Sequence, residues 1–201
     1  MDDNIQIGVN LLKLNDPVLK KIIEDHGECT LKSSNSYFKN LVRSIISQQL
    51  SVNAAKTIYN RLLDECKTIT PRQVKSQSIE NLRRAGLSNQ KAEFILSLAN
   101  FAIKNPKFFK EIEKLPDEEI IIELRKIRGI GEWTAQMFLI FSINRLNVLP
   151  INDVGFRRSV RKNYSINENA DLDEEILNIS KLWGNYRTIA AWYLWKSLDN
   201  K

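Results

Sequence analysis

The sequence predicts an all-α protein, and three observations support this fold class. Apolar residues recur at the three- and four-residue spacing of amphipathic helices along nearly the whole chain. No long stretch alternates apolar and polar residues, as a half-buried strand would. Proline and glycine number only 5 and 7 among 201 residues, and several stand where a helix would begin or end. We therefore expect short helices joined by short loops.

The punctuation of the chain divides it into these helices. Pro71 and Pro106 each fit the first turn of a helix, where the missing N–H costs no hydrogen bond. Gly86 fits a C-terminal stop, and Asp117 is expected as an N-cap at the start of an acidic first turn. The expected helices cover residues 17–25, 37–48, 52–64, 71–75, 79–85, 89–105, 106–110, 117–126, 132–143, 154–164, 171–183 and 186–196.

Composition and charge restrict the class of protein. The chain is 43% hydrophobic and 27% charged, which is typical of an ordered globular protein, and its net charge of +6 favours a polyanionic partner. Cys29 and Cys66 stand alone, so we expect neither a disulfide framework nor a metal cluster, and a reducing compartment. The acidic start, Met1 to Asn4, lacks a signal core, and no apolar run approaches the roughly 18 residues of a membrane span. We expect an intracellular protein without a cofactor.

A two-glycine turn is the first chemical motif. Residues 124–135 predict a helix, a turn through Gly129 and Gly131, and a second helix. Glycines there allow a tight turn and leave backbone N–H groups open to a phosphate, while the second helix adds its positive N-terminal end. An ordinary helical hairpin, whose glycines only turn the chain, is the alternative interpretation.

The wider sequence resembles the helix-hairpin-helix superfamily of base-excision DNA glycosylases. In that family the hairpin is followed by a Gly/Pro-rich stretch and a catalytic aspartate, and residues 149–153 (Leu-Pro-Ile-Asn-Asp) fill this position. Residues 41–51 are similar to the segment that probes the duplex in the alkyladenine branch, and residues 186–195 to that branch's last helix. The resemblance covers most of residues 37–196 and is strongest to the 3-methyladenine glycosylase II group.

The resemblance implies a single domain, residues 1–201, with two helical lobes flanking a cleft. One lobe is expected at about residues 36–135, including the hairpin, and the other at about residues 1–35 together with 136–201. Some relatives carry a separate N-terminal sheet domain, for which residues 1–30 are too short.

Asp153 is the catalytic residue that the resemblance implies. Cleavage of an N-glycosidic bond develops positive charge on the sugar, which a carboxylate stabilises while it orients or deprotonates water. The alternative is that Asp153 is only the N-cap of the next helix, a role that Asn152 could share. The family often has an aspartate at position 152, so Asn152 is a departure from its pattern.

Trp133 decides which chemistry is expected. Bifunctional members of the superfamily carry a lysine at this position, which attacks the sugar and later permits strand cleavage. Tryptophan cannot form a Schiff base, so the resemblance implies a monofunctional enzyme that uses water and leaves an abasic site. Members with a four-cysteine iron–sulfur loop are poor matches, since no cysteine follows Cys66.

Aromatic and sulfur-containing side chains are expected to hold the flipped base. An alkylated purine is positively charged and stacks on electron-rich faces. The candidates are Trp133, Trp195, Met137 and Tyr193. Core packing is the alternative for each of them, and it is the preferred interpretation of Trp183 and Trp192.

Other residues are expected to contact DNA. Gln49, together with Gln48, is expected to fill the gap left by the flipped nucleotide, although an ordinary helix end could carry both. The hairpin contacts are expected at Gly129, Gly131 and Thr134. The family's hairpins also suggest a monovalent cation at the carbonyls of Arg125, Ile127 and Ile130. A solvated surface is the preferred interpretation for most of the basic cluster Arg157, Arg158, Arg161 and Lys162.

The expected partner is double-stranded DNA with alkylated bases, bound by a monomer at an intracellular site. The expected reaction is hydrolytic excision of 3-methyladenine or 7-methylguanine. Two alternatives stay open: a glycosylase for hypoxanthine, ethenoadenine or an oxidised purine, and a non-catalytic helix-hairpin-helix module that only binds DNA.

Overall fold

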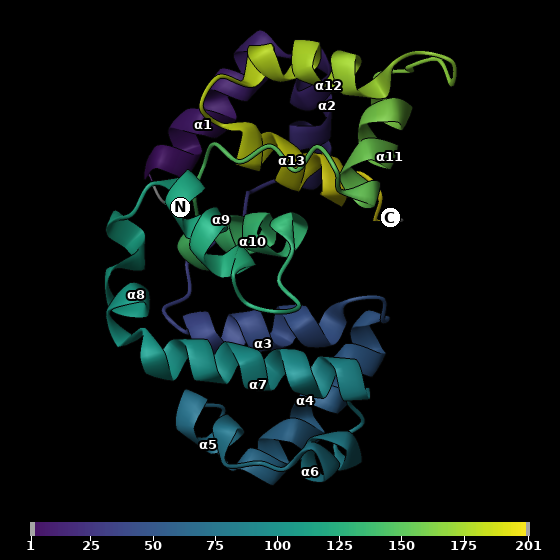
Figure 1. Ribbon diagram of the computed structural model, residues 1–201. Helices are drawn as coiled ribbons and strands as arrows, with labels where there is room; N and C mark the ends of the chain where they lie inside the picture. The colour runs from purple at the N-terminus through teal and green to yellow at the C-terminus, as the bar shows by residue number, and fades with distance from the viewer. Residues whose placement is uncertain (1–2, 200–201) are drawn as a thin grey trace. The chain divides into compact units, whose positions relative to one another are not determined.

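The computed structural model describes residues 3–199, which form helices joined by turns, without a strand among them (Figure 1). The predicted all-α class is therefore confirmed. Met1 and Asp2, which belong to the acidic start of the chain, lie outside the described residues, as do Asn200 and Lys201.

The α-helices are α1 (Asp3–Asn15), α2 (Pro17–His26), α3 (Tyr37–Ser47), α4 (Val52–Cys66), α5 (Pro71–Lys75), α6 (Ile79–Arg84), α7 (Asn89–Lys104), α8 (Pro106–Glu111), α9 (Asp117–Arg125), α10 (Glu132–Phe138), α11 (Val154–Asn163), α12 (Leu172–Ser180) and α13 (Arg187–Lys196). Turns of 3-10 helix span Ile112–Lys114 and Lys181–Trp183, and a π-helical turn spans Leu139–Ile143.

Three local features differ from the prediction. Helix α1 was not predicted, although it buries Ile5, Val9 and Leu12 at helical spacing. Pro116, not Asp117, precedes the first turn of α9, because the extended backbone of Pro116 places Asp117 as the first helical residue. The helix expected over 132–143 changes to π geometry at Leu139, a wider turn that periodicity does not reveal.

The described residues form two compact units. The 34–143 unit is centred on α3, which packs against α4, α7 and α10. The buried residues of α3 are Tyr37, Leu41, Val42, Ile45 and Ile46. Where the chain enters and leaves this unit, the Ser34 N–H donates to the Ser142 carbonyl oxygen at 3.0 Å.

The second unit, here called the terminal unit, contains the described residues up to Ser33 and from Asn144 onward. Helix α13 packs against α1, α2 and α11 and is buried from Thr188 to Leu194. A helix that is apolar on all sides belongs in a core. Gly8 lets α1 approach it closely, because a Cβ there would lie 2.4 Å from Cδ1 of Tyr186 and 2.5 Å from Cδ1 of Ile189.

A buried aspartate fixes the start of α2 in the terminal unit. Asp16 is fully buried, and its Oδ1 accepts from the N–H groups of the first turn, Val18 at 2.9 Å and Leu19 at 3.0 Å. Its Oδ2 accepts from the Tyr164 hydroxyl at 2.5 Å and from Nε1 of Trp183 at 2.9 Å. Burial, together with the hydrogen bond to Asp16, raises the pKa of the Tyr164 hydroxyl well above its ordinary value. Four donors thus compensate the buried carboxylate.

None of the helices within residues 3–199 combines the length and the apolar character needed to span a bilayer.

Candidate functional site

Asp153 stands at the N-terminus of α11, as the capping interpretation predicted. Its backbone is extended, and its Oδ1 accepts the Phe156 N–H at 2.7 Å. The side chain is half-buried, whereas that of Asn152 is exposed. The positive end of the helix and the capping bond both stabilise a negative carboxylate here.

Trp195 gives Asp153 a second donor. Its Nε1–H donates to the same Oδ1 of Asp153 at 2.8 Å, so this oxygen is held from two directions. Gly155 makes room for the contact, since a Cβ there would lie 3.3 Å from Oδ1 of Asp153 and 3.4 Å from Cδ1 of Trp195. The two donors fix the orientation of the carboxylate. Sequence reasoning did not reveal this role for Gly155.

Hydrogen bonds from two side chains hold the segment that leads to Asp153 near both of its ends. The buried Thr188 hydroxyl donates to the Arg145 carbonyl oxygen at 2.7 Å and accepts the Val148 N–H at 3.0 Å. Nη1 of Arg157 donates to the Ile151 carbonyl oxygen at 3.1 Å and pairs with Asp173. Arg157 is therefore part of the support for this segment. Arg158 and Lys162, by contrast, are exposed, as expected of a solvated surface.

Asp153 and Asp16 use the same local device in different surroundings. Each caps a helix, and each accepts an indole N–H, from Trp195 and Trp183 respectively. Asp16 is 0% exposed, so solvent and ligands cannot reach it, whereas Asp153 is half-buried. Accessibility therefore distinguishes a structural aspartate from a candidate catalytic one.

The two glycines of the hairpin between α9 and α10 have different structural roles. Gly129 has φ +93°, in the left-handed region, and a Cβ there would lie 2.1 Å from Cγ of Phe94 on α7. Gly131 has φ −91°, and among the described residues no heavy atom beyond its immediate chain neighbours lies within 4 Å of where its Cβ would stand. Gly129 is required for the turn, while Gly131 leaves open space before the first turn of α10.

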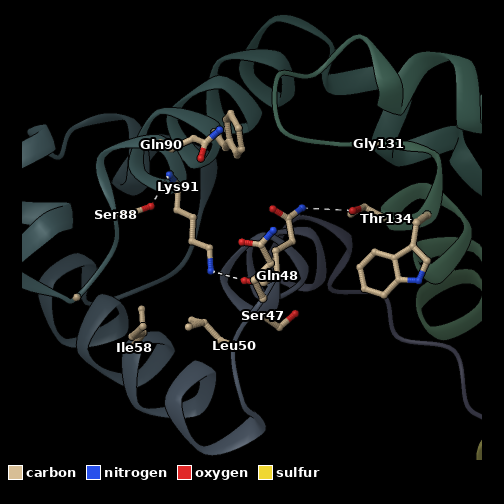
Figure 2. A pocket seen from close by; sticks show the side chains of 13 residues that line it. Ser47, Gln48, Leu50, Ile58, Ser88, Gln90, Lys91, Gly131 and Thr134 are labelled. Carbon is tan, nitrogen blue, oxygen red and sulfur yellow. Dashed lines mark hydrogen bonds between the residues drawn. The ribbon is translucent and has the colours of Figure 1, made fainter. Parts of the chain in front are cut away.

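Gln48 joins the end of α3 to this hairpin. Its Nε2 donates to the Gly129 carbonyl oxygen at 3.1 Å and to Oγ1 of Thr134 at 3.3 Å, the second bond being visible in Figure 2. The Thr134 side chain is only 3% exposed. The side chains of Gln48 and Thr134, both predicted DNA contacts, are thus occupied in positioning the hairpin.

Gln49 and Leu50 form the exposed tip after α3. Gln49 has φ +57°, an uncommon left-handed conformation for a residue other than glycine. Leu50 is 39% exposed, and sequence reasoning did not single it out. Strained backbone of this kind persists where the surroundings enforce it.

Lys91 binds the chain just before Gln49, a role that sequence reasoning did not reveal. Its Nζ donates to the Ile46 carbonyl oxygen at 2.6 Å and to the Gln48 carbonyl oxygen at 2.7 Å, and Figure 2 shows it reaching from α7 to the end of α3. Desolvation lowers the pKa of Lys91 below its ordinary value. The last carbonyls of a helix need donors from elsewhere, but periodicity does not reveal which residue supplies them.

Trp133 and the tip line one hollow of about 680 Å³ in the 34–143 unit. Figure 2 shows this hollow, with Gln48, Leu50 and Thr134 among the labelled residues. Trp133 is 38% exposed, far more than a core tryptophan. Met137 follows one turn later in α10 and is 9% exposed, at the margin of the core. The structure therefore brings together Trp133, Gln48, Gln49, Gly131 and Thr134 around one space.

Three aromatic residues of the terminal unit lie in its core. Tyr193 is 0% exposed and donates its hydroxyl to the Gly27 carbonyl oxygen at 2.8 Å, so it presents no ring face to a base and is not retained as a base-binding candidate. Trp183 is 1% and Trp192 is 9% exposed, which agrees with the core interpretation. Trp195 stays half-buried beside Asp153.

The remaining expectations concern a cation site at the hairpin and the two cysteines. The Ile127 carbonyl oxygen accepts the Ile130 N–H at 3.0 Å, and a cation at the hairpin carbonyls of Arg125, Ile127 and Ile130 stays a prediction. Within residues 3–199, Cys29 and Cys66 are buried free thiols, and burial raises the pKa of each.

Comparison with known proteins identifies the family. Residues 42–185 match the HhH-GPD superfamily of base excision DNA repair proteins. The chain is 35% identical over 164 residues to DNA-3-methyladenine glycosylase 1 of Schizosaccharomyces pombe, covering 80% of this chain and 72% of that protein. The chain belongs to the HhH-GPD superfamily, which confirms the resemblance drawn from its sequence.

Two solved structures agree with this membership. The crystal structure of DNA-3-methyladenine glycosidase from Bacillus halodurans matches with a TM-score of 0.82 at 36% identity, covering 94% of this chain and 88% of that one. The Schizosaccharomyces pombe 3-methyladenine DNA glycosylase in complex with abasic DNA matches with a TM-score of 0.79 at 31% identity, covering 94% and 95%.

Proposed function

We propose that this protein is a monofunctional DNA glycosylase that hydrolyses the N-glycosidic bond of alkylated purines, 3-methyladenine and 7-methylguanine, in duplex DNA. One observation carries the proposal: Asp153 offers an accessible, doubly anchored carboxylate at a helix N-terminus in a chain whose relatives are named 3-methyladenine glycosylases. The product would be an abasic site, as in the DNA bound by the Schizosaccharomyces pombe relative.

The proposed reaction follows from the charge that develops on the sugar. As the bond to the base breaks, the deoxyribose acquires oxocarbenium-like positive charge, which the Asp153 carboxylate stabilises. Asp153 also orients water and accepts its proton as the hydroxyl adds to C1′. An N-alkylated purine leaves as a neutral base, so the step needs little help from an acid. Phe156 N–H and Trp195 Nε1–H hold the carboxylate in one orientation before the substrate arrives.

Trp133 supports the choice of water as the nucleophile. It occupies the position where bifunctional relatives would carry an attacking lysine, and an indole cannot form a Schiff base with the sugar. Borohydride should therefore trap no covalent adduct between this protein and damaged DNA. A trapped adduct would contradict the monofunctional assignment.

The proposed DNA contacts divide between positioning and recognition. Trp133 and Trp195 would stack against the flipped base, where a cation–π contact contributes about 0.5–2 kcal/mol, and Met137 would pack beside it. Gln49, whose side chain is exposed, would fill the gap in the duplex. Gln48 would act through the hairpin, because it binds Gly129 and Thr134.

The decisive experiment compares two aspartate-to-asparagine variants. Asp153→Asn keeps an oxygen that accepts both N–H groups but removes the charge, so base release from methylated DNA should fall by a factor of about 100–1000 while DNA binding persists. Asp171→Asn is the matched control, since Asp171 caps α12 through the N–H groups of Asp173 and Glu174. It should release bases at the wild-type rate, as measured by mass spectrometry of the free bases.

Full activity of Asp153→Asn would contradict the mechanism. A panel of duplexes, each with one lesion, separates the alternatives. Faster release of hypoxanthine, ethenoadenine or an oxidised purine would reassign the substrate, and DNA binding without release of any base would indicate a non-catalytic module.

A further inference from the structure

A basic groove runs along α3 and α4 in the 34–143 unit, apart from the residues assigned above. Two adjoining hollows of about 480 Å³ and 350 Å³ share Arg43, Tyr59 and Leu63 in their linings. We call their combined surface the α3–α4 groove. Its charged residues are Lys39, Arg43, Lys56 and Lys67.

The charge of this groove has one sign. The residues that line it include four cations and no aspartate or glutamate. All four cationic side chains are exposed, and within residues 3–199 none of them takes part in an ion pair. Like charges gathered in a concave surface focus a positive potential and attract an anionic partner.

One cation is held in place before any partner binds. The guanidinium carbon of Arg43 lies 4.4 Å from the centre of the Tyr59 ring, and Tyr59 is half-buried. Stacking restricts the long side chain, so less conformational entropy is lost when its N–H groups bind an anion. A planar guanidinium suits the paired oxygens of a phosphate.

The groove continues from the hollow that holds Trp133 and Gln48. Ser47 lines both, at the end of α3 (Figure 2). Lys39 precedes Gln48 by about 14 Å along the axis of α3, at about 1.5 Å per residue. Successive phosphates of one DNA strand advance by about 3.4 Å along the duplex axis, so a surface of this length is long enough to face several phosphates of one strand.

We propose that the α3–α4 groove binds the phosphate backbone of the duplex flanking the lesion, as a track that extends from the Gln48–Gln49 tip toward Lys39. The inference rests on the proposed function for duplex DNA as the ligand. It adds a contact surface that is separate from both the hairpin and Asp153. The contact would carry affinity and not lesion selectivity, because phosphates are the same at every sequence.

The salt dependence of binding tests this proposal. The variant Lys39→Gln/Lys56→Gln spares Arg43, which packs on Tyr59, and Lys67, whose φ is +60°. Each phosphate contact contributes about 0.9 to the slope of log K against log salt, so the slope of the variant should be shallower by about 1.8. When salt rises from about 50 to 200 mM, the fold-loss of affinity should be about 12 times smaller for the variant than for the wild type.

The control variant removes the same number of positive charges elsewhere in the 34–143 unit. Lys107 and Lys110 are exposed on α8 and do not line the groove. Lys107→Gln/Lys110→Gln should keep the wild-type slope, as measured by fluorescence anisotropy with a duplex that carries a central abasic analogue. The two arms of the duplex are then shortened one at a time. Shortening one arm should remove the difference in salt slope between the wild type and the groove variant, whereas shortening the other arm should leave that difference unchanged.

A wild-type slope in the groove variant would overturn the proposal, and so would an equal change in the control. Persistence of the difference on both trimmed duplexes would also overturn it, because the effect would then not depend on flanking phosphates. Base release by the wild-type protein is measured in parallel. Absence of release would refute the proposed function without altering the salt slope, so the two failures are distinguishable.

Discussion

Replacing Gly129 by alanine should destabilise the protein far more than the same change at Gly131. Gly129 has φ +93°, and a left-handed conformation costs a residue with a Cβ about 1–2 kcal/mol. The added Cβ would also lie 2.1 Å from Cγ of Phe94, and overpacking of this kind costs about 1–3 kcal/mol. The expected loss is thus about 2–5 kcal/mol, which lowers Tm by roughly 4–20 °C in a chain of this size.

Thermal unfolding of both variants, followed by circular dichroism, measures the difference. Gly131 has an ordinary φ of −91° and open space around its Cβ position, so Gly131→Ala should cost no more than about 1 kcal/mol, from the poorer N-cap that alanine makes for α10. Equal Tm values for the two variants would refute the reasoning. They would mean that neither the left-handed backbone nor the contact with Phe94 constrains the hairpin.

Two further predictions concern single side chains. Lys91→Met removes the cation that binds the Ile46 and Gln48 carbonyl oxygens, so the free energy of unfolding should fall by about 1–3 kcal/mol and DNA affinity with it, whereas Lys104→Met on the same helix should have little effect. Urea denaturation measures the first change, and equal losses in both variants would contradict it. Burial raises the pKa of Tyr193 to about 12, so the folded state holds this proton more tightly than the unfolded chain, whose tyrosines titrate near pH 10. The contribution of Tyr193 to stability is therefore complete below about pH 10 and declines as the pH rises to about 12. Tyr193→Phe should flatten the decline of the urea midpoint in this window, and an unchanged decline would show that Tyr193 does not cause it.

Local rules predicted most of the helices. Proline at the start of α2, α5 and α8 and the apolar spacing of α3 and α7 act within a few residues, so the sequence alone reveals them. The π-helical turn after Phe138 and the cap of α9 depend on backbone geometry that periodicity does not encode. These errors are confined to element ends and one missed helix, α1.

The candidate site was likewise predictable only where it depends on local sequence patterns. A glycine turn, a tryptophan after it and an aspartate before a helix are local patterns, so Gly129, Trp133 and Asp153 could be selected from their order along the chain. Sequence reasoning selected both Tyr193 and Trp195 as base-binding candidates, with core packing open for each, although they stand two residues apart on α13. One is buried against Gly27 and the other reaches Asp153.

The sequence by itself determined the all-helical class, the family and the positions where the chemistry is expected, because these depend on periodicity and on the order of motifs. Only the tertiary structure decided which side chains support the others: Lys91 at the end of α3, Gln48 at the hairpin, and Trp195 and Gly155 at Asp153. It also separated the buried Asp16 from the accessible Asp153. The physical reason is that hydrogen-bond partners and solvent access arise from residues distant in sequence, which meet only when the helices pack.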